Sequence, residues 1–76
     1  MTNYEMLVSE LSKMYKQGSI NGLGMTNVHL FGIKYAKELV GVNLGDLSVA
    51  ATGKESFKTE IRKGMKLSQF VELKKK

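Results

Sequence analysis

The sequence predicts an all-α fold, a four-helix compact domain followed by a short terminal segment. Apolar residues recur at three- and four-residue spacing, proline is absent, and glycines separate the apolar segments. A chain of 76 residues without cysteine has room for one core, and packing alone must hold that core together. We therefore expect a single domain over residues 1–73 and a flexible basic tail over residues 74–76.

The first helix is expected over about residues 3–17. Thr2 and Glu5 have the spacing of a capping box, and Gly18 is expected to end the helix. Its apolar stripe consists of Tyr4, Leu7, Val8, Leu11, Met14 and Tyr15. Three glycines and an Asn21-Gly22 pair predict a loop over residues 18–27.

The second helix is expected over about residues 28–40, with Thr26 or Asn27 as its cap and Gly41 at its end. Its apolar residues are so dense that most of its circumference must be covered, which predicts the central helix of the domain. Gly32 in its interior costs about 1 kcal/mol relative to alanine. That cost indicates that another backbone passes close to Gly32.

A short third helix is expected over about residues 44–52, with Asn43 as its cap and Asp46 in its first turn. Gly53 is expected to end it. Its inward positions are predicted to be Leu47, Ala50 and Ala51.

The fourth helix is expected over about residues 55–63 and is predicted to end at Gly64. Phe57 and Ile61, four residues apart, anchor it to the core. Residues 65–73 form either a last helical turn or an extended segment lying on the core.

The third and fourth helices together have the pattern of a helix-turn-helix at the C-terminal end of the domain. Gly53 provides the residue that tolerates a positive φ in the tight turn. The register differs from the usual pattern, because Val49 occupies a position that is usually small and Thr59 one that is usually aliphatic. We therefore expect the inward positions to be shifted and the angle between the helices to be non-standard.

The net charge of +5 arises entirely from the last part of the chain. Residues 1–53 carry four basic and four acidic side chains, whereas residues 54–76 carry eight basic and three acidic ones. A neutral body with a cationic end is suited to binding a polyanion through one face. On the exposed face of the fourth helix we predict base contacts from Ser56, Lys58, Thr59 and Arg62, and phosphate contacts from Lys54, Lys63 and Lys66.

The runs HLFGIKYA (residues 29–36) and TEIRKGMKL (residues 59–67), followed by Phe70 and Val71, resemble a family of small bacterial helix-turn-helix-like proteins. Some members of that family lie near restriction or mobile-element genes. The resemblance covers most of the chain after the first helix. It implies a helix-turn-helix-like fold and an association with DNA.

Other chemistry is disfavoured by the residues present. His29 is the only histidine and cysteine is absent, so we expect no metal site and no cofactor. The glycines around residues 18–24 do not match a phosphate-binding loop. A serine nucleophile would have to use His29 and Asp46, and we predict that the protein is not an enzyme and has no small-molecule substrate. His29 is expected to cap or flank the second helix.

The sequence also predicts the cellular location of the protein. No apolar run approaches the roughly 18 residues that a membrane span requires. The first residues do not form a basic region followed by an apolar block, so we expect no signal peptide and a cytoplasmic protein without membrane association.

Two functional hypotheses follow. In the first, the protein is a non-catalytic partner of double-stranded DNA that inserts its fourth helix into the major groove, as a bacterial or phage regulator or a DNA-recognition subunit. A homodimer formed through the first helix, near Tyr4 and Tyr15, would extend its short site. In the second, the basic face binds an acidic protein, for example as an inhibitor of a nucleic-acid enzyme. Competition by duplex DNA distinguishes the two.

Overall fold

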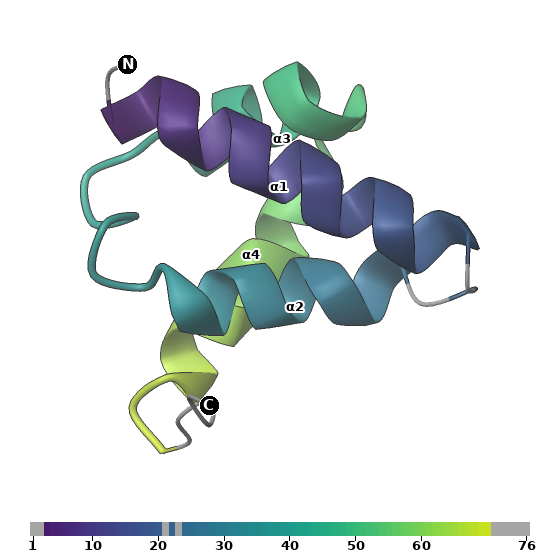
Figure 1. Ribbon diagram of the computed structural model, residues 1–76. Coiled ribbons are helices and arrows are strands. Elements are labelled where there is room, and N and C mark those ends of the chain that lie inside the picture. Colours follow the sequence, from purple (N-terminus) through teal and green to yellow (C-terminus); the bar gives the residue numbers. More distant parts are fainter. Residues whose placement is uncertain (1–2, 21, 23, 71–76) are drawn as a thin grey trace.

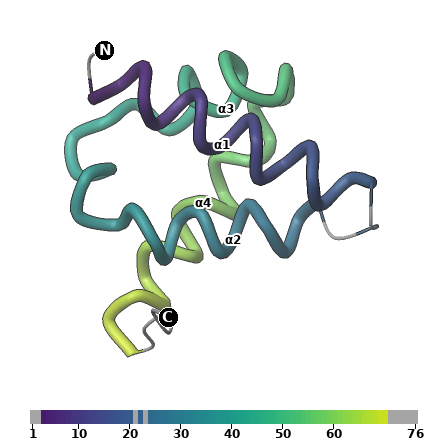
Figure 2. Tube along the Cα trace, viewed as in Figure 1, coloured from purple at the N-terminus to yellow at the C-terminus, as the bar shows by residue number. Residues whose placement is uncertain are grey.

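The structure is a computed structural model that describes residues 3–20, 22 and 24–70. Within these residues it contains α1 (Asn3–Ile20), α2 (Gly24–Lys34), α3 (Leu44–Thr52) and α4 (Phe57–Leu67) and no strand (Figure 1). α2 packs against α1 and α4, and α3 packs against the same two helices. The backbone trace shows α1 and α2 as two long rods, with α4 crossing α2 and leading away toward the C-terminus (Figure 2). The all-α prediction is confirmed.

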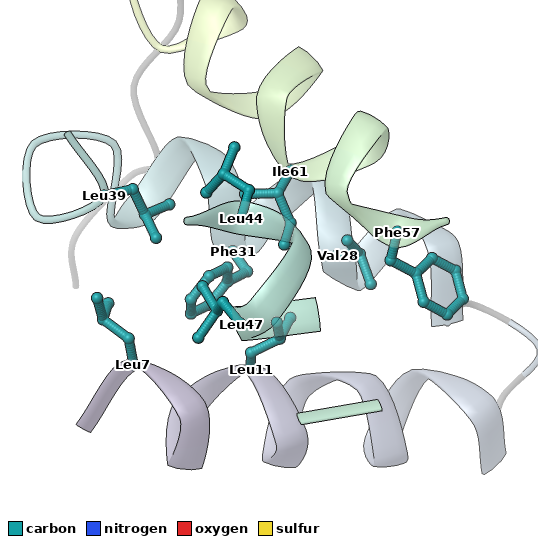
Figure 3. Close-up of a cluster of buried hydrophobic side chains, with 9 residues drawn as sticks. All are labelled: Leu7, Leu11, Val28, Phe31, Leu39, Leu44, Leu47, Phe57 and Ile61. Atoms are coloured by element: carbon teal, nitrogen blue, oxygen red, sulfur yellow. The ribbon is translucent and has the colours of Figure 1, made fainter. Parts of the chain in front are cut away.

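One apolar core joins all four helices (Figure 3). Phe31 from α2 and Leu47 from α3 are fully buried. The remaining members are Leu7, Leu11, Val28, Leu39, Leu44, Phe57 and Ile61. Each large apolar side chain that is removed from water contributes about 1.5–3 kcal/mol, so these few residues supply most of the driving force for folding. Phe57 and Ile61 anchor α4 as predicted.

The boundary between α1 and α2 differs from the prediction. α1 continues through Gly18 to Ile20, and Gly18 is buried within the helix instead of ending it. Gly22 is the glycine with a left-handed backbone here, at φ 74°. Asn27 lies inside α2, where its amide donates a hydrogen bond to the carbonyl oxygen of Met14 at 2.7 Å. The expected loop over residues 18–27 is therefore wrong at both ends, and Asn27 bonds α1 instead of capping α2.

α2 ends at Lys34, earlier than predicted, and residues 35–41 continue as hydrogen-bonded turns. The Leu39 amide donates to the carbonyl oxygen of Tyr35 at 3.0 Å, and Gly41 closes the segment at φ 82°. Leu39 enters the core, whereas Val40 is 76% exposed. The apolar sequence over residues 28–40 was dense because it supplies both a helix and this core-facing turn.

The backbones of α2 and α4 approach closely where Gly32 faces Gly64. A Cβ atom on Gly32 would collide with the carbonyl oxygen of Ile61 and lie 3.1 Å from the Cα of Gly64. A Cβ atom on Gly64 would collide with the carbonyl oxygen of His29. The close approach predicted at Gly32 is thus confirmed. The prediction that Gly64 ends the fourth helix is wrong, because Gly64 is buried inside α4.

The bounds of α3 agree with the prediction, and its cap is confirmed. The Asn43 side-chain oxygen accepts a hydrogen bond from the Asp46 amide at 3.1 Å. Of the predicted inward positions Leu47 is buried and Ala51 half-buried, but Ala50 is exposed. Ser48 is buried in its place.

Of the two alternatives for residues 65–73, the last helical turn is confirmed for residues 65–67, and the extended segment on the core is wrong for the described residues. α4 runs to Leu67, and residues 68–70 form a turn in which Phe70 is 81% exposed. Phe70 therefore does not lie on the core. The predicted cap at Thr2, the turn residue Asn21, the end of the 65–73 segment and the basic tail over residues 74–76 fall outside the described residues.

Substituting Gly64→Ala tests the helix contact. The new methyl group meets backbone atoms that cannot rotate away, so we expect overpacking to cost about 3 kcal/mol. Alanine recovers about 1 kcal/mol of helix propensity, which leaves a net loss of about 2 kcal/mol in the free energy of unfolding, measured by urea denaturation.

Gly24→Ala is the matched control, because its Cβ would meet side-chain atoms of Ser19 and Tyr15 at 3.3 and 3.4 Å. These side chains can move, so the control should change stability by less than Gly64→Ala does. Equal stability of the Gly64→Ala variant and the original protein would contradict the close contact.

Candidate nucleic-acid interface

A turn of four residues, Gly53–Ser56, connects α3 to α4. Gly53 adopts the left-handed conformation at φ 80°, and its amide donates to the carbonyl oxygen of Val49 at 2.9 Å. The sequence therefore located the turn glycine correctly. The predicted start of the helix at residue 55 is two residues early, since α4 begins at Phe57.

Thr52, which was not among the predicted turn residues, stabilises the turn through its hydroxyl. Its hydroxyl donates to the carbonyl oxygen of Ser48 at 2.7 Å and accepts from the Lys54 amide at 3.2 Å. One side chain thus binds the last turn of α3 to the residue after Gly53. A threonine immediately before a turn glycine was the available signal, because short hydroxyl side chains bond to nearby backbone groups.

The shifted register is visible in the burial pattern. Val49 is 49% exposed and Thr59 is exposed, although these two positions usually face inward in a helix-turn-helix. Ser48 and Ile61 are fully buried. The Ser48 hydroxyl has no hydrogen-bond partner among the described residues.

The predicted contact residues lie around the solvent-facing side of α4 and in the turn before it. Lys58 and Arg62 are separated by one helical turn, and Lys66 follows by another, so they form one stripe. The residues that α4 buries lie on its other side and are Phe57, Ile61 and Gly64. Exposed predicted residues are Lys54, Ser56, Thr59, Arg62, Lys63 and Lys66, and Lys58 is half-buried. We call the stripe of Lys58, Arg62 and Lys66 the basic stripe.

Two acidic side chains lie beside this surface. The Glu55 carboxylate accepts a hydrogen bond from the Lys58 ammonium at 2.7 Å. This bond and the attraction of the Lys58 charge lower the pKa of Glu55 below its usual value, so the carboxylate is ionised at neutral pH. Lys58 is therefore held near the start of α4 by an acidic neighbour.

Glu60 joins α4 to α2 by pairing with His29. Its side chain is 13% exposed, and Oε1 lies 3.2 Å from Nε2 of His29 while Oε2 lies 3.6 Å from the Lys63 ammonium. His29 lies inside α2 and pairs with α4, so its expected role as a cap or flanking residue is wrong. The sequence gives no local sign of this pair, because the two residues are 31 positions apart.

The described residues contain no cluster of three or more His, Asp or Glu side chains arranged to hold a metal ion. In the same part of the chain, no helix has the length and apolar character needed to cross a membrane.

The fold and the turn agree with a comparison against protein families. A model described as an HTH-like domain, that is, a helix-turn-helix-like domain, matches residues 3–74. The chain belongs to this HTH-like domain family. No curated protein and no solved structure matched the chain.

Membership of the HTH-like domain family suggests DNA binding in general terms. Domains of this kind are typically non-enzymatic.

Proposed function

We propose that this HTH-like domain binds double-stranded DNA without catalysis by placing α4 in the major groove. The basic stripe of Lys58, Arg62 and Lys66 carries the proposal, because it lies on the side of α4 that the core leaves free. Within the described part of the chain, no ion pair involves Arg62 or Lys66. Both cations are therefore available to an anionic ligand.

The side chains divide into two roles in this proposal. The side chains that approach base edges are those of Arg62, Lys58, Thr59 and Ser56. Arginine can donate two hydrogen bonds to guanine, and a hydroxyl can either donate a hydrogen bond to a base or accept one from it. Lys54, Lys63 and Lys66 neutralise phosphates. Lys63 lies 3.6 Å from Glu60 in the free protein and turns toward the backbone of DNA when it binds.

One such domain covers few base pairs, because α4 has 11 residues and spans about 16 Å. Useful specificity therefore calls for a homodimer or a partner subunit. In this proposal the dimer contact lies on α1 at Tyr4, which is 40% exposed. Tyr15 packs against Phe57 with ring centroids 5.1 Å apart, so it serves the core. The protein would act in the cytoplasm as a regulator or as a DNA-recognition subunit.

The direct test is fluorescence anisotropy of a labelled random-sequence duplex at several salt concentrations. If about five phosphates are neutralised, the logarithm of the association constant should fall against the logarithm of salt concentration with a slope of roughly −4 to −5. A folded sample that does not bind the duplex at low salt would refute the proposal and favour an acidic protein as the partner.

The double variant Lys58→Ala with Arg62→Ala tests the assigned face. Neither side chain belongs to the buried set of α4, so helical circular dichroism should be unchanged. Duplex affinity should fall by at least about tenfold. The double variant Lys13→Ala with Lys16→Ala removes the same charge from exposed positions of α1. An equal loss in both double variants would show that net charge matters and the α4 face does not.

Glu55→Gln tests whether the ion pair with Glu55 weakens the interaction of Lys58 with DNA. Glutamine keeps the size of the side chain but removes the negative charge next to the Lys58 ammonium, so duplex affinity at neutral pH should rise a few-fold. Because the pKa of Glu55 is lowered, the difference should persist through mildly acidic pH. It should vanish as the pH falls through that lowered pKa and the carboxyl of the original protein becomes neutral. Glu10→Gln on α1 makes the same charge change, and an equal gain there would contradict a local effect.

A further inference from the structure

A groove of about 380 Å³ lies next to the basic stripe, between the turn after α2 and the last turns of α4. Its apolar lining includes Ala36, Val40, Leu44 and Met65. Val40 is 76% exposed, so an apolar group that covered it would remove apolar surface from water. The groove is large enough to accept one or two apolar side chains of a ligand.

The charged residues that line this groove are all cationic: Lys37 from the turn segment, and Arg62 and Lys66 from α4. No acidic residue lines it, although Asp46 and Glu55 line the adjoining cavity that shares Arg62 and Met65 with it. A ligand that fills the groove must therefore combine apolar groups for the floor with negative charges for the rim. DNA provides the charge, but its bases offer little apolar surface beyond the thymine methyl group.

We propose that this groove binds an acidic segment of a partner protein, in which carboxylates flank a large apolar side chain. The apolar side chain covers Val40 and Met65 and leaves water, while the carboxylates lie against Lys37, Arg62 and Lys66. This surface is distinct from the predicted base contacts at Ser56 and Thr59, which do not line the groove.

The groove and the proposed DNA face share Arg62 and Lys66. The acidic segment and DNA would therefore exclude each other, so that the partner releases the domain from DNA. This competition rests on the proposed DNA-binding function, whereas binding of the segment does not.

The probe for binding is a fluorescent synthetic peptide in which glutamates flank a Leu-Leu pair, titrated in the absence of DNA. One matched peptide replaces the leucines by serines, and another replaces the glutamates by glutamines. Each replacement should weaken binding by at least about fivefold, because the apolar floor and the cationic rim both contribute. Equal binding of the serine peptide would overturn the proposal, since simple attraction to cations would then suffice.

Two variants separate this groove from the DNA face. Val40→Ser removes the exposed apolar group and should lower the affinity for the Leu-containing peptide by about five- to tenfold. The affinity for the duplex should be unchanged. Lys63 does not line the groove. Lys63→Ala should therefore lower the affinity for the duplex and leave the affinity for the peptide unchanged. A Val40→Ser protein that binds the peptide as tightly as the original would refute the groove as the site.

Addition of the unlabelled Leu-containing peptide to the duplex complex tests the competition. We expect the duplex to be released at peptide concentrations that match the measured affinity. If the peptide binds but the duplex stays bound, the exclusion is wrong. If the peptide binds and no duplex binds under any condition, the DNA proposal fails while the groove proposal stands.

Discussion

The contact between Gly32 and Gly64 determines where α4 lies, and the orientation of every cation on α4 depends on it. Neither glycine has space for a Cβ atom, since each would collide with a carbonyl oxygen of the other helix. The two helices can therefore approach until their backbones touch. At that separation Phe57 and Ile61 enter the core and the basic stripe remains on the free side of α4.

Polar interactions also hold α4 in this position. The pairing of Glu60 with His29 joins α4 to α2, and the Thr52 hydroxyl fixes the turn that leads into α4. The acidic residues near α4 are used locally, Glu55 by Lys58 and Glu60 by His29 and Lys63. Arg62 and Lys66 are in none of these ion pairs, and both line the apolar groove.

Local signals in the sequence predicted much of this fold, and long-range contacts account for the errors. α3 begins after Asn43 and ends before Gly53 as predicted, because a helix cap and a left-handed turn depend on adjacent residues. Gly18 and Gly64 are also glycines, but both lie buried inside helices and end neither of them. At Gly64 the close backbone of α2, and not a turn, requires glycine. The sequence predicted that the cations of α4 face solvent, but it offered no sign that His29 would meet Glu60 across two helices.

The central claim is that duplex DNA is bound by the solvent-facing side of α4. Amide chemical-shift mapping of the labelled protein, titrated with a duplex, tests it most directly. The account predicts that the largest changes cluster from Gly53 through Lys66, with smaller changes along α1. Changes centred on α1, with α4 unaffected, would contradict the claim even if the protein binds DNA tightly.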